Sequence, residues 1–285
     1  MEYHTTQRIA EAIAFIEAHL QEKIVLETVA DAVHYSKYHL HRMFTDAVGI
    51  TVHDYIQRRR LTEAARLLTD SQKSIMDISL CAGYESQQAF TSIFKAMYKQ
   101  TPLTYRKNGK FYPLQLAFPL HRWPEGSFSL KPEIACAVPA DIPGWMEFAF
   151  LVIDGFPCFE ASAHMACLKG YMAHQSALIM RRRETIIGAA AFTYAAGSID
   201  FFAIHPQYRR QGAAGVFLDY ISNRVFDGRE ISITTFREGD RADVGQRAQY
   251  KRLGFQESEL LTEFGYPTQR MILHKDRDTS GGTGK

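Results

Sequence analysis

The residues with the clearest chemistry form a turn of small residues in the second half of the chain. Residues 199–204 are predicted to form a buried strand that Pro206 ends, and the sequence RRQGAAG at 209–215 then opens an amphipathic helix. The first amides of a helix have no partner within it, and the helix dipole adds positive potential, so such a turn suits a pyrophosphate. Gly212 and Ala214 keep the backbone within reach of that ligand. The pattern R-x-x-G-x-A also occurs in ordinary turns, and the dinucleotide fingerprint G-x-G-x-x-G is absent.

A second set of candidate residues lies in the first half, which repeats itself at an offset of 50 residues. Each unit is predicted as a short helix, a tight turn, a serine at the N-cap and a second helix, which is the helix-turn-helix arrangement. The residues that repeat are mainly those that a three-helix core needs: Ala32, Ser36, Leu40, Phe44, Thr51 and Tyr55 match Ala82, Ser86, Phe90, Phe94, Thr101 and Tyr105.

The exposed positions of the two second helices differ, as reading two DNA segments would require. The first helix carries Lys37, Tyr38, His41 and Arg42, and the second carries Gln87, Gln88, Ala89 and Ser92. Glutamine can pair bidentately with adenine, and arginine with guanine. We also expect Ser36 to contact DNA, and we expect phosphate contacts from Arg58, Arg59, Arg60, Lys95, Lys99, Arg106 and Lys107. A helical protein-interaction module with solvated arginines remains the alternative.

The elements that must position these residues change in character near residue 108. Residues 1–107 are predicted to be helical, with a long helix over 52–68 that opens on the capping box Thr51-x-x-Asp54. That helix would span roughly 25 Å, while two recognition helices on one face of DNA lie ~34 Å apart. Residues 108–129 are rich in proline and predict a linker. Residues 130–275 alternate β-rich runs with amphipathic helices, and the small polar residues 276–285 predict a disordered tail.

Composition places both parts among folded proteins. A chain of 285 residues can form two domains, and its 46% hydrophobic and 22% charged residues are typical of globular proteins. The net charge of +2 means that any DNA contact depends on how charge is arranged. The four cysteines lack C-x-x-C or zinc-site spacing, which predicts reduced, mostly buried thiols and no metal. No apolar run approaches the ~18 residues of a membrane span and no signal peptide is visible, so we expect a cytoplasmic protein without membrane contact.

Three stretches of the helical half identify a family: YSKYHLHRMFTDAVG from Tyr35, YIQRRRLTEAARLL from Tyr55 and GYESQQAFTSIFKAMYKQTPLTYRK from Gly83. They resemble the DNA-binding domain of AraC/XylS transcription regulators. The resemblance implies an all-α domain with tandem helix-turn-helix units that binds double-stranded DNA. It assigns base reading to Tyr38, His41 and Arg42 in the first unit and to Gln87, Gln88 and Ser92 in the second. Many relatives carry Arg at the position of Ser92 and Gln at that of His41, so the operator sequence does not transfer.

The motifs AIHPQYRRQGAAG from Ala203 and YKRLGF from Tyr250 resemble the GNAT N-acetyltransferase superfamily, from about Glu133 to Leu273. The resemblance implies an α/β domain, with a mixed sheet flanked by helices, that uses acetyl-CoA or another acyl-CoA. It places the pantetheine arm along the strand that contains Ala203 and Ile204. It places the pyrophosphate at the turn formed by Arg209, Gln211, Gly212, Ala213, Ala214 and Gly215.

The same resemblance suggests the catalytic groups. Tyr250 would protonate the departing thiolate while an amine attacks the thioester. Many relatives carry a glutamate base where this chain has Ser198, so Asp200, on the same face of the strand, is the candidate base. Glu238 and Asp240 are further candidates. The alternatives are a core tyrosine at Tyr250 and solvated carboxylates elsewhere.

Three functions fit these observations. A transcription regulator could bind DNA and also transfer an acyl group to an amine-bearing small molecule or protein, with RNA polymerase a candidate partner. The second domain could instead sense acyl-CoA or another ligand and control DNA binding without chemistry. Third, the chain could be an enzyme whose helical half mediates partner contacts. Because the small-residue turn and Tyr250 are both present, we favour the first function.

Overall fold

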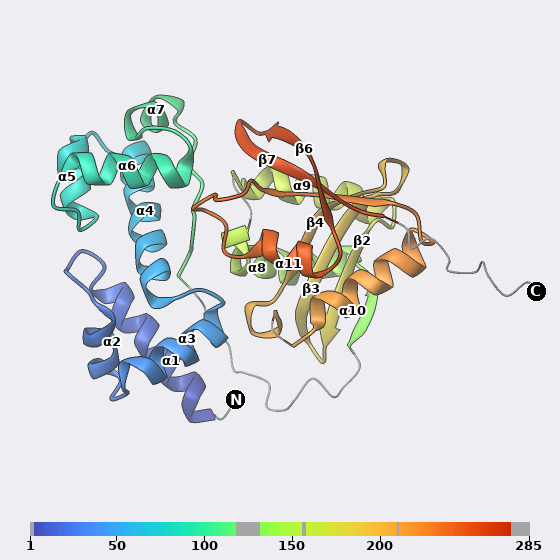
Figure 1. Ribbon diagram of the computed structural model, residues 1–285, viewed down its shortest axis with the longest axis horizontal. Coiled ribbons are helices and arrows are strands. Elements are labelled where there is room, and N and C mark those ends of the chain that lie inside the picture. Colours follow the sequence, from blue (N-terminus) through green and yellow to red (C-terminus); the bar gives the residue numbers. More distant parts are fainter. Residues whose placement is uncertain (1–2, 118–131, 156–157, 210, 275–285) are drawn as a thin grey trace, which may run out of the picture.

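The computed structural model describes residues 3–117, 132–155, 158–209 and 211–274 (Figure 1). In the first half the serine caps and the repeat are confirmed. Ser36 and Ser86 accept hydrogen bonds from the amides of His39 and Ala89, and each opens a recognition helix. The helices of this half are α1 (Tyr3–Ala18), α2 (Leu26–Ala32), α3 (Lys37–Val48), α4 (Val52–Asp70), α5 (Ile75–Cys81), α6 (Gln87–Tyr98) and α7 (Pro102–Asn108).

Two hydrophobic cores form along the long helix α4, one for each unit. The first contains Ile9, Phe44 and Tyr55 and joins α1, α2 and α3 to the start of α4. The second contains Phe90 and Phe94 and joins α5, α6 and α7 to the end of α4. The helix predicted over 52–68 is therefore confirmed as the element that connects the two units (Figure 1).

The first part of the predicted linker packs against α4. Tyr112, Leu114 and Gln115 are buried, and the amides of Leu114 and Gln115 donate to Thr62 Oγ1 at 3.0 and 3.2 Å. The remainder of the predicted linker, residues 118–129, and the predicted disordered tail, residues 276–285, lie outside the described residues.

The second half is built on a seven-stranded sheet with the strand order β1-β2-β3-β4-β5-β7-β6. All neighbouring strands are antiparallel except β4 and β5, which are parallel. The strands are β1 (Glu133–Cys136), β2 (Ala177–Arg182), β3 (Thr185–Thr193), β4 (Ser198–Ile204), β5 (Ile231–Phe236), β6 (Gln256–Glu263) and β7 (Tyr266–Leu273). The α-helices are α8 (Ile142–Leu151), α9 (Ala161–Ala173), α10 (Ala213–Tyr220) and α11 (Gln246–Arg252).

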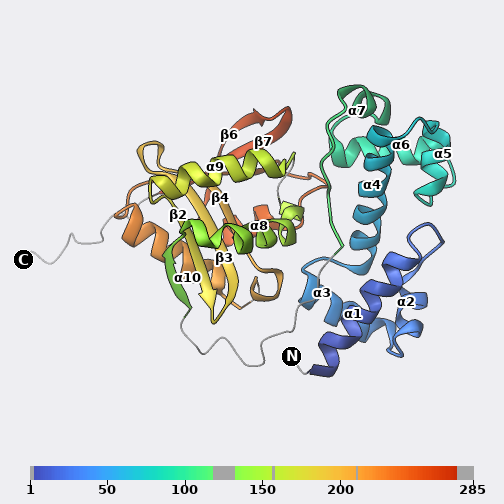
Figure 2. The ribbon, with the colours of Figure 1, turned by 180° about the vertical axis from the view of Figure 1, so that it is seen from behind.

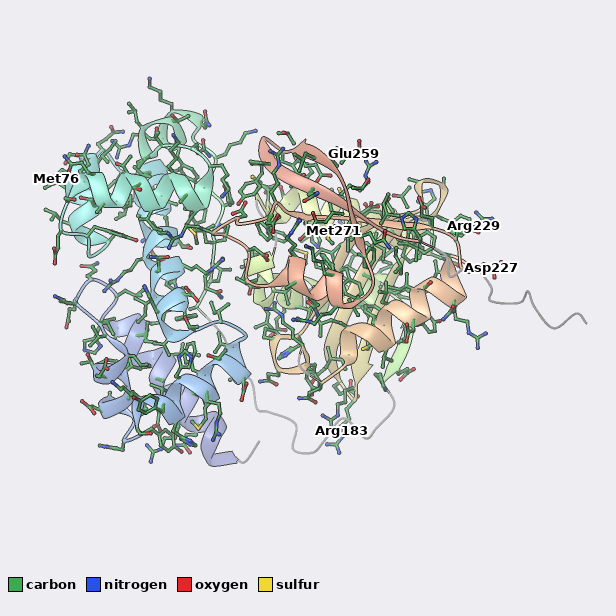
Figure 3. All side chains as sticks on the ribbon, in the orientation of Figure 1. Met76, Arg183, Asp227, Arg229, Glu259 and Met271 are labelled. Atoms are coloured by element: carbon green, nitrogen blue, oxygen red, sulfur yellow. The ribbon has the colours of Figure 1, made fainter. Side chains whose placement is uncertain are left out.

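Helices cover both faces of this sheet. Helices α8 and α9 pack on one face through Trp145, Phe148 and Leu168 (Figure 2). Helices α10 and α11 cover the other through Phe217, Leu218 and Tyr250 (Figure 1). Met271 of β7 is fully buried in this second layer, whereas Arg183, in the β2–β3 turn, points away from the domain (Figure 3). The mixed sheet flanked by helices is the predicted α/β architecture.

The two halves meet along α3, α4 and the segment 237–245 that precedes α11, named here the bridging loop. Lys99 Nζ pairs with Asp240 of this loop at 2.7 Å, and Arg58 Nη2 donates to the carbonyl of Ala242 at 2.5 Å. Val244 of the same loop packs against the core of the first unit. The bridging loop therefore contacts both helix-turn-helix units.

No helix among the described residues is both long and apolar enough to span a membrane. Within the same residues, no cluster of His, Cys, Asp and Glu could hold a metal ion. All four cysteines are free thiols, but Cys136 and Cys167 are exposed, so the prediction of mostly buried thiols is wrong. Cys136 lies on β1, at the edge of the sheet, and Cys167 lies on α9, which covers one face of the sheet.

Candidate functional site

Strands β4 and β5 separate soon after they begin, which opens a gap in the sheet. They pair at Ser198 with Ser232 and at Ile199 with Ile233, and no later pair occurs among the described residues. On its other edge β4 stays paired with β3 as far as Ile204. The edge of Phe202, Ala203 and Ile204 that faces β5 thus has backbone groups that an extended ligand could pair with.

A cleft of about 190 Å³ lies at this opening. From the second domain it is lined by the predicted residues Ala203, Ile204 and Arg209, and by Phe202. Helix α11 and the residue before it contribute Gly245, Gln246, Ala248, Gln249 and Arg252. Val152, Pro206 and Val244 complete this side. A further wall comes from the helical first half, whose residues Thr45, Asp46 and Gly49 at the end of α3 line the same cleft. Sequence reasoning missed this wall, because nothing local to residues 45–49 signals a contact with residues about 150 positions away.

The small-residue turn opens α10 without a capping side chain. Gly212 is the N-cap with φ +79°. A Cβ built at Gly212 would meet nothing within 4 Å, so the turn borders open space, and Gln211 is exposed beside it. The first amides of α10 and its dipole can accept a phosphate group there. The residues present therefore fit the pyrophosphate of an acyl-CoA.

The side chain of Arg209 has a structural partner. Its Nη1 and Nη2 lie 3.2 and 3.1 Å from the carboxylate of the buried Asp154, and its Nε donates to the carbonyl of Ile204. The guanidinium thereby holds the turn to β4 and to residues 153–155. Any contact of Arg209 with phosphate would have to share this ion pair, so the backbone amides are the main anion-binding groups.

Tyr250 lies in α11 and is 2% exposed. Its ring packs against Phe202 and Phe255, with ring centroids 6.3 and 5.8 Å apart. Burial raises the pKa of Tyr250; the charge of Asp243 adds to the rise and Arg209 opposes it. Like any tyrosine, Tyr250 is protonated at neutral pH and can serve as a proton donor, and the raised pKa makes it a weaker acid. Among the described residues, Gln249 lines the cleft and the adjacent Tyr250 does not.

Asp200 sits at an irregularity of β4, where the register with β3 shifts between Ala191 and Phe192. Its exposed carboxylate accepts hydrogen bonds from three hydroxyl groups, at 2.9, 2.6 and 2.7 Å, from Tyr171, Thr193 and Ser198. Burial, followed by the charge of Asp200, raises the pKa of Tyr171. These hydroxyl groups fix the orientation of the carboxylate and leave one of its roughly four acceptor sites.

Asp240, a further candidate for the general base, has a buried side chain, so the alternative of a solvated carboxylate is wrong for this residue. Its side chain is 3% exposed, pairs with Lys99 and accepts from the hydroxyl group of Tyr266. Glu238, in the same loop, is exposed. The pairing with Lys99 also corrects the prediction that Lys99 contacts phosphate.

The predicted base-reading residues form two exposed faces. Tyr38, His41 and Arg42 are exposed on α3, and Gln87, Gln88 and Ser92 are exposed on α6. Ser36 caps α3, and Lys37 pairs with Glu27 at 3.0 Å and lies over the Tyr38 ring. Lys95 is exposed on α6. Both helices end against the second domain, at Gly49 and at Lys99, and the predicted residues lie nearer to their first turns.

The prediction that Arg59 contacts phosphate is wrong in this structure. Arg59 is 7% exposed and pairs with Glu17 at 2.8 Å and with Glu63 at 3.2 Å. Burial alone would lower the pKa of Arg59, but the hydrogen bonds and charge of Glu17 raise it above its ordinary value. Arg58 and Arg60 donate to backbone carbonyls. The side chains of Arg58, Arg59 and Arg60 therefore bind other parts of the protein and stabilise the packing around α4.

Comparison with known proteins matches each half separately. A helix-turn-helix domain family matches residues 29–108, and an acetyltransferase (GNAT) domain family matches residues 152–274. The probable transcription factor PqrA of Proteus vulgaris is 42% identical over 103 residues, which are 35% of this chain and 84% of that protein. The first half belongs to the AraC-type regulators.

The second half is a GNAT domain. An AraC-type regulator structure from Chromobacterium violaceum is 29% identical and covers 36% of this chain and 92% of its own, with a TM-score of 0.35. A GNAT-family acetyltransferase from Bacillus cereus is 15% identical and covers 51% of this chain and 99% of its own, with a TM-score of 0.40. The family matches join an AraC-type helix-turn-helix domain at residues 29–108 to a GNAT domain at residues 152–274.

Proposed function

We propose that this AraC–GNAT protein is a sequence-specific transcription regulator whose second domain transfers an acyl group from acyl-CoA to an amine. The observation that carries the acyltransferase part is the separation of β4 from β5 next to the open turn at Gly212. A strand edge for an amide-containing arm and a helix N-terminus for a pyrophosphate lie side by side, which matches the two polar parts of coenzyme A.

The exposed faces of α3 and α6 support sequence-specific DNA binding. Arg42 in the first unit and Gln87 and Gln88 in the second can make bidentate contacts with guanine and adenine, respectively. Lys95 is exposed on α6, which supports its proposed contact with a phosphate. Two units in one chain can occupy adjacent major-groove segments, so a monomer suffices for two-site reading.

In the transfer step, the bound acyl-CoA supplies an activated thioester carbonyl. The backbone of Ala203 and Ile204 would align the arm. The amides from Gly212 to Gly215 would hold the phosphates, since the amide of Gln211 already donates to the carbonyl of Tyr208. Tyr250, which is protonated at neutral pH, would donate its proton to the departing thiolate. Asp200 would take the proton of the amine, and its three hydroxyl partners would hold it in position.

The first test is calorimetric titration of the full-length protein with acetyl-CoA, and with free CoA in parallel. Gly212→Glu should weaken acetyl-CoA binding roughly a hundredfold or more, because it places a negative charge and bulk where the phosphates bind. Gly265→Glu is the matched control, since Gly265 has a similar φ of +78° and equally open surroundings in the β6–β7 turn. Equal affinity in Gly212→Glu and Gly265→Glu would disprove the phosphate site.

Turnover separates catalysis from sensing. With an accepted amine, Tyr250→Phe should lower kcat by about a hundredfold, as loss of a general acid does, while acetyl-CoA binding stays unchanged. An unchanged kcat would remove Tyr250 from the mechanism.

A sensor without chemistry is the second candidate function. It is favoured by the wall that Thr45, Asp46 and Gly49 of the DNA-binding half contribute to the cleft. A pure sensor would bind acetyl-CoA, show no transfer to any amine and be indifferent to Tyr250→Phe.

A further inference from the structure

The first helix-turn-helix unit closes the outer side of the cleft tightly. Helix α3 packs against residues Pro206–Tyr208, which directly precede the small-residue turn. A Cβ built at Gly49 would lie 3.0 Å from Arg209 Nη1 and 3.7 Å from Pro206 Cβ. The backbone of this unit therefore rests on the residues that lead into the proposed phosphate site.

The cleft is too small for acyl-CoA in this arrangement. Its volume of about 190 Å³ falls below the ~300–1,000 Å³ of pockets that hold drug-sized ligands, and acyl-CoA is larger than such ligands. The inner walls cannot easily yield, since β4 is hydrogen-bonded to β3 as far as Ile204 and α11 is anchored through buried Tyr250. A wall supplied by another domain can move, because domain interfaces permit rigid-body displacement.

The contacts that hold the helical half in position lie partly outside the cleft. Lys99, at the end of α6, reaches the buried carboxylate of Asp240 in the bridging loop. Asp240 also accepts from the Tyr266 hydroxyl and from the amide of Ala242. Since α4 joins the two units, this ion pair helps to keep the first unit on the cleft. It can be removed without changing any residue that lines the cleft.

We propose that docking of the first helix-turn-helix unit inhibits acyl-CoA binding, and that acyl-CoA enters when this unit moves away. The inference rests on the proposed function, because it assumes that the cleft is the acyl-CoA site. By thermodynamic linkage, acyl-CoA must then weaken the docking of the first unit by the same factor that docking weakens acyl-CoA binding. The DNA-binding half acts as a cover of the acyltransferase site.

The test compares acetyl-CoA affinities of three full-length proteins by calorimetry: the unmodified chain, Lys99→Asn and Lys73→Asn. Asparagine tolerates the left-handed backbone of residue 99, where φ is +60°. Lys73 is exposed in the loop between α4 and α5, so Lys73→Asn makes the same charge change away from the interface. We expect Lys99→Asn to bind acetyl-CoA about five- to tenfold more tightly, the lower end of typical coupling between sites. Lys73→Asn should match the unmodified chain.

The outcomes separate the two proposals. If all three proteins bind acetyl-CoA equally, or Lys99→Asn binds more weakly, the cover is disproved and the acyl-CoA site stands. If none binds, the proposed acyl-CoA site fails and the cover fails with it.

Hydrogen exchange on the unmodified chain gives an answer even if Lys99→Asn folds poorly. Acetyl-CoA should increase amide exchange in the bridging loop, residues 237–245, while it protects the turn at 211–215. Protection of both segments would mean that the unit closes on the ligand, which contradicts the proposal.

Discussion

The two helix-turn-helix units share a scaffold and differ in how they meet the second domain. Recognition helices α3 and α6 span equivalent residues, and both end in a left-handed cap, at Gly49 with φ +86° and at Lys99 with φ +60°. The first cap is Gly49, where a Cβ would lie close to Arg209 and Pro206 of the second domain. Lysine stands where a long side chain reaches buried Asp240. The equivalent positions 49 and 99 thus have different roles. Gly49 lets the first unit approach the second domain closely, and Lys99 forms an ion pair with it.

This difference shows which features of a duplicated scaffold are shared and which are specific. The N-cap serines and the core aromatics recur because each unit must bury the same three-helix core. The caps diverge because each unit meets a different part of the GNAT domain. The arginine run of α4 adds a third difference, since Arg59 ties the first unit to α1, whereas the equivalent position of the second unit is Gly109.

The largest expected effect comes from breaking that tie. Arg59→Met should lower the free energy of unfolding of the DNA-binding half by about 3 kcal/mol, because the partly buried Glu17 loses its guanidinium partner and keeps only the hydrogen bond from the Tyr55 hydroxyl group. Chemical denaturation monitored in the helical half measures the loss. The dependence of DNA affinity on salt should keep its slope. If the slope of log affinity against log salt concentration fell by about one in Arg59→Met, Arg59 would be a phosphate contact after all.

Base reading should also differ between the units. Arg42→Ala should weaken binding to the specific operator by about 1–3 kcal/mol, as loss of a bidentate base contact does. Ser92→Ala, at the equivalent position of the second unit, should cost less than about 1 kcal/mol, since a hydroxyl makes a weaker contact. Equal losses on specific and random DNA would instead assign Arg42 to phosphate. Electrophoretic or fluorescence titrations with both DNAs measure this difference.

The smallest effect concerns the close approach at the first cap. Gly49→Ala should destabilise the protein by about 1–2 kcal/mol through its left-handed backbone, with an added cost from the contact with Arg209. Gly109→Ala is the control, because Gly109 is also left-handed, at φ +63°, but has open surroundings. A melting temperature that falls equally in both variants would show that Arg209 gives way without cost.

Much of the local structure could be predicted from sequence because its causes are local. The caps at Ser36, Thr51 and Ser86 were identified from the spacing of a polar side chain and the amide that it accepts from. The turn at Gly212 was identified from a small residue between a strand and a helix. The roles of Arg59 and Lys99 were not, because the face of a helix that an arginine or lysine occupies does not reveal its partner.

Periodicity, capping and backbone freedom act over a few residues, so the two halves, the repeated units and the candidate residues for DNA and pyrophosphate could be predicted from the residues alone. The folded structure was needed to show that the DNA-binding half lines the cleft of the GNAT domain and that Asp200 is held by three hydroxyl groups. Such contacts join residues far apart in the chain, and their energies depend on burial and distance, which exist only once the chain has folded.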